Sequence, residues 1–215
     1  PLKGLLPPRI ALAIALQICQ GLGYAHSAED DSGRAMHLVH RDLKPGNLML
    51  DRRGVLKILD FGVARAETNL FTTQTVGMTK GTPAYMSPEQ TTGERTDPID
   101  RRSDLFSIGS LIAEVITGEV SFHATRLYEV LRKIADGDTG TVFERVRERL
   151  PEMEPVIRRA LQPRPADRYS SAEEMGVAIQ AIYDELPGDE EITPWLAEWM
   201  EGANPDLAPL ARSEI

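Results

Sequence analysis

Val-His-Arg-Asp-Leu-Lys-Pro-Gly-Asn, at residues 39–47, is the stretch from which the rest of this sequence can be interpreted. Asp42 and Asn47 stand on either side of a Pro-Gly pair, so they belong to a loop and not to one face of a helix. Apolar residues that favour strands flank this loop at 38–39 and 48–50. The pattern predicts a strand, a polar loop and a second strand.

The side chains of the loop suggest a chemistry. A further short strand is expected at residues 55–59, and it would deliver Asp60 to the same end of a hairpin as Asn47. Mg²⁺ prefers oxygen ligands and shares them with substrate phosphates, so one amide and one carboxylate are a plausible protein contribution. Asp42 could accept or orient a hydroxyl proton. Lys44 could neutralise the charge of a phosphoryl oxygen.

Two motifs agree with this chemistry position by position. Residues 40–47 match the kinase signature His-Arg-Asp-Leu-x-x-x-Asn, and residues 60–62 read Asp-Phe-Gly. On these motifs the sequence resembles the C-terminal lobe of a eukaryotic-like (Hanks-type) serine/threonine protein kinase of bacterial type, over about residues 7–186. The resemblance implies an α+β fold, mainly helical, with a small β-hairpin at the catalytic loop. The alternative, a chance cluster of surface charges, does not explain agreement at every motif position.

The resemblance also implies roles for individual residues. Asp42 would be the catalytic base, and Lys44 would contact the γ-phosphate of ATP. Asn47 and Asp60 would hold Mg²⁺. Other positions would have supporting roles: Gly62 would let the activation segment turn, Met49 would floor the adenine pocket or be an ordinary core residue, and His40 and Phe61 would stack in a hydrophobic column.

Between Asp60 and Glu89 the family has its activation segment, and here its middle is polar and rich in threonine. Such a composition predicts a loop. A phosphate on one of these threonines would add roughly two negative charges and could pair with an arginine. The resemblance makes Arg41 that arginine. The candidate phosphorylation sites, against the alternative that threonine is simply common in loops, are Thr73, Thr75 and Thr79.

The segment closes with Gly-Thr-Pro-Ala-Tyr-Met-Ser-Pro-Glu at residues 81–89, which is similar to the substrate-docking loop of serine/threonine kinases. Ser87 stands where the family's Ala-Pro-Glu motif has alanine. By resemblance, Thr82 would lie near the catalytic residues and would indicate Ser/Thr rather than Tyr acceptors. Glu89 is expected to pair with a buried Arg168.

Apolar spacing predicts several helices. The first two are expected to be buried, and the second carries Asp104, whose carboxylate could accept backbone N–H groups of the catalytic loop. The Ser171 and Glu174 spacing is that of a capping box, which supports a helix start there. The predicted helices cover residues 7–26, 103–117, 124–135, 151–161 and 171–186, with a polar surface loop between His26 and His37.

Composition limits the remaining possibilities. The chain has 215 residues, which is enough for one domain with a core. Its net charge of -9 is unfavourable for general nucleic-acid binding. The single Cys19 cannot form an internal disulfide, which suits a cytoplasmic location, and its apolar setting predicts burial. No apolar run is long enough to span a membrane, so no membrane segment is expected within this chain.

The two ends of the sequence suggest a piece of a longer protein. The chain begins with proline and contains no Gly-rich loop or ATP-pairing lysine, so it lacks an N-lobe. Residues 1–186 are interpreted as the C-lobe and 187–215 as an extension or linker. Trp195 and Trp199, four apart, could form one face of a short helix that docks on the lobe or on a partner.

Three functions are compatible with these features. The first is a protein Ser/Thr kinase that uses ATP and Mg²⁺ on protein substrates, self-associates for autophosphorylation, and is inactive or weak as this piece alone. A small-molecule phosphotransferase would not explain Arg41, Lys44 and residues 81–89 together. A pseudokinase or interaction module is the third, and the intact set of catalytic residues argues against it.

Overall fold

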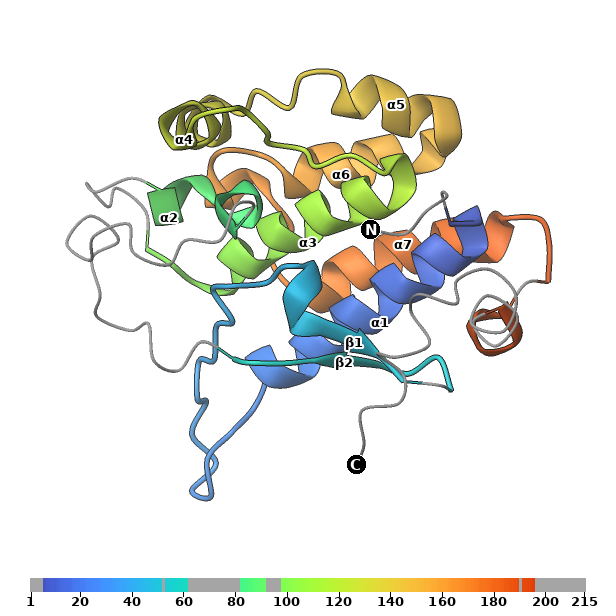
Figure 1. The fold of residues 1–215 in the computed structure, drawn as a ribbon. Coiled ribbons are helices and arrows are strands. Elements are labelled where there is room, and N and C mark those ends of the chain that lie inside the picture. Colours follow the sequence, from blue (N-terminus) through green and yellow to red (C-terminus); the bar gives the residue numbers. More distant parts are fainter. Residues whose placement is uncertain (1–5, 52, 62–81, 92–97, 190, 196–215) are drawn as a thin grey trace.

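The computed structural model describes residues 6–51, 53–61, 82–91, 98–189 and 191–195. Helices dominate this part of the chain, and one two-stranded antiparallel sheet lies at the edge of the helical body (Figure 1). The predicted mainly helical α+β fold with a small hairpin is therefore confirmed.

The first helix, α1 (Pro8–His26), begins with proline in its first turn, where a missing N–H removes no helical hydrogen bond. It packs against α3 (Arg101–Thr117) and α7 (Ala172–Glu185), which lies along it in Figure 1. Residues 7–26 were predicted as a helix, and this is confirmed. The helix is not buried on all sides, however, because Gln20 and Tyr24 are exposed to solvent.

Helix α3 forms the centre of the core. The Asp100 carboxylate caps its start by accepting the Arg102 N–H at 2.8 Å, and Gly118 ends it in the left-handed conformation, at φ 76°. The prediction of a buried helix at 103–117 is confirmed. Its fully buried apolar side chains include Leu105, Phe106, Ile108, Leu111 and Ile112.

The sequence analysis predicted most of the other helices. The three predicted at 124–135, 151–161 and 171–186 are present, but α5 was missed because its eight residues bury only Val142 and Val146. Two apolar positions are too few to reveal a helical period. The further elements are α2 (Pro88–Thr91), α4 (Leu127–Asp136), α5 (Val142–Arg149) and α6 (Glu154–Ala160), with the 3₁₀ turns η1 (Pro45–Asn47), η3 (Thr82–Tyr85), η4 (Pro151–Met153) and η5 (Pro165–Asp167).

The predicted hairpin is formed by β1 (Leu48–Leu50) and β2 (Leu56–Ile58), in the register Leu48 to Ile58. The strand expected at residues 38–39 is wrong: the chain there has no regular structure, and within the described residues no strand is available to pair with it. A strand needs a hydrogen-bonded neighbour, and local β-propensity cannot supply one.

The capping box predicted at the start of α7 is present in part. The Ser171 Oγ accepts the Glu174 N–H at 3.2 Å, as expected. The Glu174 carboxylate accepts the N–H and hydroxyl of Ser170, both at 2.7 Å, instead of returning to Ser171. In the part of the chain that the structure describes, no helix is long and apolar enough to cross a membrane.

Close packing of α3 on α6 leads to a first prediction. A Cβ added at Gly109 would lie 2.7 Å from the Ala160 Cβ, closer than real Cβ atoms approach one another. Gly109→Ala is therefore expected to lower the free energy of unfolding by about 1–3 kcal/mol in urea denaturation. Gly176→Ala in α7 is the matched control: its Cβ would meet the Cys19 Cβ at an ordinary 3.4 Å, so it should be neutral or slightly stabilising. Equal stabilities for the two variants would contradict the packing argument.

Candidate active site

The loop around Asp42, residues 39–47, is held in place by one carboxylate. Asp104, in the first turn of α3 and 1% exposed, accepts the His40 N–H on Oδ2 and the Arg41 N–H on Oδ1, each at 2.8 Å. The predicted anchoring by Asp104 is thus seen in the hydrogen bonds. It holds Arg41 at φ 65°, a left-handed conformation that non-glycine residues keep only when their surroundings impose it.

Asp104 has a third hydrogen-bond partner, which was not predicted. The His26 Nε2, at the end of α1, lies 2.8 Å from the Asp104 Oδ2, although the two residues are 78 positions apart in sequence. Since a carboxylate accepts, the hydrogen is assigned to Nε2. The sequence analysis assigned no partner to His26, and no local pattern could have identified one. The carboxylate of α3 therefore joins α1 to the catalytic loop.

His40 links this loop to the end of β2. Its ring is fully buried, its Nε2 lies 2.9 Å from the Leu59 carbonyl oxygen, and the Asp42 N–H donates to its Nδ1 at 3.3 Å. These partners fit a neutral ring with the hydrogen on Nε2. The ring also meets Phe61 edge to face, with centroids 4.8 Å apart. The two residues predicted to stack are therefore in contact.

Three of the predicted catalytic side chains converge in the same loop. The Lys44 Nζ donates to the Asp42 Oδ2 at 2.8 Å, so the two side chains project the same way, as expected from an extended segment. The Asn47 Nδ2 donates to the Asp42 backbone oxygen at 2.7 Å. A positive charge and an amide thus surround a carboxylate that remains partly open to solvent.

The hairpin brings the two oxygen ligands of the sequence motif to one end. The Leu59 N–H donates to the Asn47 backbone oxygen at 2.8 Å, which places Asp60, the next residue, beside the loop. Asp60 is exposed and has φ 55°. The Asn47 Nδ2 is engaged as a donor, and Oδ1 is the atom of this amide that can bind a cation. An amide oxygen and an open carboxylate fit a divalent cation that takes its other ligands from water and phosphate.

Met49 lies on β1 with 46% of its surface exposed. The alternative that it is an ordinary core residue is therefore wrong. An exposed apolar side chain on the strand next to Asn47 agrees with a role at the floor of a nucleotide site, which stays a prediction.

A buried ion pair ties the end of the docking segment to the body. The Arg168 Nη1 and Nη2 donate to the Glu89 Oε1 and Oε2, both at 2.8 Å, as the sequence predicted. The Ser103 hydroxyl adds a bond of 2.6 Å to the same carboxylate. Burial by itself raises the pKa of Glu89, but the bonds and charge of Arg168 and the Ser103 hydroxyl outweigh it, and the pKa lies below its ordinary value.

A row of serines on α3 was missed by the sequence analysis. Besides Ser103, Ser107 donates to the Tyr85 carbonyl oxygen at 2.7 Å and Ser110 to that of Ala84 at 3.3 Å. All three serines are buried. The signal was available as serines at helical spacing within an apolar helix, which cannot all face solvent. This row attaches η3 and α2 to the core.

The residue after Glu89 also contacts the Asp42 loop. Gln90, in α2, donates from its Nε2 to the Arg41 backbone oxygen at 2.7 Å. The side chain of Thr82 is not among those described, although its backbone begins η3. Four further predicted residues lie outside the described part of the chain: Gly62, Thr73, Thr75 and Thr79.

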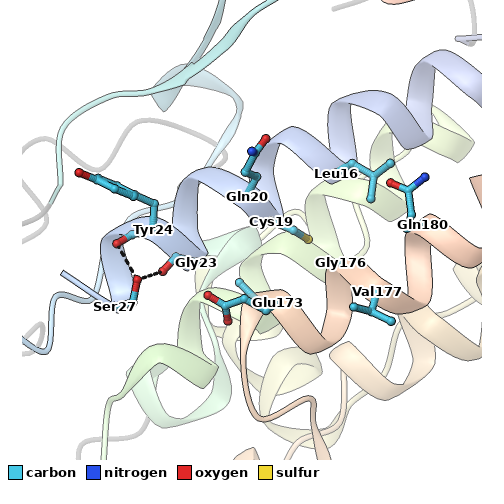
Figure 2. Close-up of a pocket in the computed structure, with 11 residues that line it drawn as sticks. Leu16, Cys19, Gln20, Gly23, Tyr24, Ser27, Glu173, Gly176, Val177 and Gln180 are labelled. Atoms are coloured by element: carbon cyan, nitrogen blue, oxygen red, sulfur yellow. Dashed lines mark hydrogen bonds between the residues drawn. The ribbon is translucent and has the colours of Figure 1, made fainter.

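A separate open groove of about 530 Å³ runs between α1 and α7 (Figure 2). Its lining includes Cys19, Glu173 and Gly176 but none of the predicted site residues. The predicted burial of Cys19 is confirmed, and burial, followed by the negative charge of Glu173, raises the pKa of its thiol to about 12. The thiol is therefore protonated at neutral pH and unreactive.

Comparison with known proteins identifies the family. The family model described as the protein kinase domain matches residues 2–178. The chain belongs to the protein kinase domain family, which agrees with the geometry of the Asp42 loop.

Three curated relatives are bacterial kinases. "Tyrosine-protein kinase MasK" of Myxococcus xanthus is 35% identical, over 84% of this chain and 27% of the relative. "Probable serine/threonine-protein kinase SCO3848" of Streptomyces coelicolor is 36% identical, over 96% and 29% respectively. "Serine/threonine-protein kinase PknL" of Mycobacterium tuberculosis is 34% identical, over 86% and 43%. The chain spans less than half the length of each.

Proposed function

We propose that these residues are the C-terminal lobe of a bacterial protein Ser/Thr kinase, which transfers the γ-phosphate of ATP to hydroxyl groups of protein substrates. The observation that carries the proposal is the convergence of Lys44 and Asn47 on Asp42, with Asp60 joined to the same loop through the hairpin. Phosphoryl transfer requires little covalent chemistry from the protein and depends on positioning and charge neutralisation.

In this function Asp42 orients the acceptor hydroxyl and receives its proton, and Lys44 lies against the transferred phosphoryl group. Asn47 and Asp60 would hold Mg²⁺, which would neutralise phosphate charge when bound with ATP. Substrate hydroxyls approach along residues 81–89, whose end is held by the Glu89–Arg168 pair.

Regulation is proposed at the activation segment. Among the described residues, none of the ion pairs involves the Arg41 guanidinium, which supports a role in pairing with a phosphorylated Thr73, Thr75 or Thr79. Autophosphorylation there in trans would bring two copies of the kinase together. The unpaired, buried Cys19 supports a reducing compartment such as the cytoplasm.

Phosphotransfer from ATP with Mg²⁺ to a generic protein substrate and to itself tests the proposal. We expect residues 1–215 alone to be inactive or weak, and a longer protein that adds the Gly-rich loop and ATP-pairing lysine to be active. Analysis of the phosphorylated amino acids separates Ser/Thr from Tyr acceptors. This measurement is needed because the Myxococcus relative is named a tyrosine-protein kinase. If a well-folded longer protein transfers no phosphate, a pseudokinase is favoured. Strong phosphotransfer by residues 1–215 alone would contradict the prediction that this piece is inactive or weak.

A further inference from the structure

The chain beyond α7 returns to the β1–β2 hairpin, next to which the proposed metal ligands Asn47 and Asp60 lie. Residues 191–195, here called the C-terminal turn, form one helical turn closed by the Trp195 N–H on the Glu191 oxygen at 3.2 Å. Trp195 and Ile192 are partly buried against the core, so the predicted docking of Trp195 on the lobe is seen. Trp199 lies outside the described residues. In Figure 1 this turn lies near the tip of the hairpin.

Contacts between the C-terminal turn and the hairpin tip are close. The Thr193 hydroxyl donates to the Arg53 carbonyl oxygen at 2.7 Å. A Cβ at Gly54 would come within 3.0 Å of the Ile192 Cγ2 and 3.2 Å of the Thr193 Oγ1. Gly54 is buried and has φ 74°, so glycine suits both the turn geometry and the approach of the neighbouring chain.

The hairpin also contacts α1. The Gln17 Nε2 donates to the Gly54 oxygen at 2.9 Å, and its Oε1 accepts the Leu56 N–H at 2.8 Å. The exit from α7 is joined to the same helix, because the Arg9 Nη1 donates to the Leu186 oxygen at 2.8 Å. The hairpin tip is therefore held between α1 and the C-terminal turn.

A two-stranded hairpin is at best marginally stable by itself, and each strand here has three residues. Contacts at its tip therefore influence its other end, where Asn47 and Asp60 lie. We propose that the C-terminal turn is a positioning strap for this hairpin, and that Ile192 and Thr193 influence metal and nucleotide use by holding its tip. This inference rests on the proposed function and extends it to residues beyond 186.

The test uses the longer, active kinase with Ile192→Ser and Thr193→Val combined, and Thr193→Val alone as a milder variant. Glu191→Gln, an exposed change in the same turn, is the control. Two quantities are measured: hydrogen exchange of the peptide covering residues 46–61, and the Mg²⁺ concentration that gives half-maximal phosphotransfer. We expect exchange in this peptide to rise about tenfold in the double variant, with α3 unchanged, and the Mg²⁺ requirement to rise at least about threefold.

If hydrogen exchange in the hairpin is unchanged in the double variant, the proposal that the C-terminal turn holds the hairpin is wrong. Faster exchange with an unchanged Mg²⁺ requirement would overturn its influence on the site. If the longer protein with its native sequence transfers no phosphate, the proposed function fails, whereas the exchange measurement still decides whether the turn holds the hairpin. Should the double variant not fold, Thr193→Val must show the same two changes at smaller size, and their absence overturns the proposal.

Discussion

Asp42→Asn in the longer kinase is expected to lower the rate of phosphotransfer by about 10²–10⁴-fold, the range that a positioned general base contributes. The amide keeps the size of the side chain, so the loop geometry set by Asn47 and Asp104 should persist. It removes the negative charge that pairs with Lys44 at 2.8 Å and that, in the proposed function, accepts the substrate proton. Steady-state kinetics with ATP and a protein substrate measure this effect.

Two controls make the result specific to the site. Asp31→Asn changes an exposed carboxylate in the loop after α1 and should leave the rate unchanged. Circular dichroism and the urea midpoint of Asp42→Asn should match those of the native sequence. A rate within about threefold of native for Asp42→Asn would contradict the role assigned to this carboxylate.

Arg168→Leu is expected to destabilise the chain by about 3–5 kcal/mol, because it leaves the Glu89 carboxylate buried without its charge partner. The side chains of the pair are 0% and 3% exposed, and Arg168 also donates to the backbone oxygens of Gln162, Pro163 and Arg102. The free energy of unfolding from urea denaturation measures the loss. Arg34→Leu, which removes an exposed ion pair with Asp30, should change it by less than about 1 kcal/mol.

The same pair makes stability depend on pH. The pKa of Glu89 in the folded protein lies below its ordinary value of 4.5. Its ionised form therefore stabilises the fold fully above the unfolded pKa, and this contribution is lost as pH falls through the lowered folded pKa. The difference between native and Arg168→Leu should accordingly be largest at neutral pH and shrink in acid. A difference independent of pH would contradict a charge-based origin.

A double variant separates the pair interaction from the loss of packing. Glu89→Met combined with Arg168→Leu removes both charges, so it should recover part of the stability lost in Arg168→Leu alone. A double variant as unstable as the sum of the two single changes would indicate that each side chain acts independently.

Much of this protein could be predicted from short windows of its sequence. The residues of the Asp42 loop identified the family and the chemistry, since each motif position carries a specific group at a specific place. Helices α1, α3 and α7 follow from apolar spacing and from local end signals such as the Ser171 cap. These signals act over one or two helical turns, so they can be read without knowing the tertiary structure.

Other features depended on contacts between distant parts of the chain. Nothing near His26 predicts that its ring meets Asp104, and nothing near Thr193 predicts its bond to Arg53, 140 positions away. The strand expected at residues 38–39 failed for the same reason, because pairing requires a neighbour that local propensity does not supply.

The sequence by itself determined the family and most of the helical framework, because these are encoded in residue type and local spacing. The tertiary structure alone decided which distant groups share a partner. The sequence predicted that Asp104 could accept N–H groups of the Asp42 loop, but only the packing of α1 against α3 brings the His26 ring to the same carboxylate. Long-range partners become defined only when buried polar groups must be satisfied together within one core.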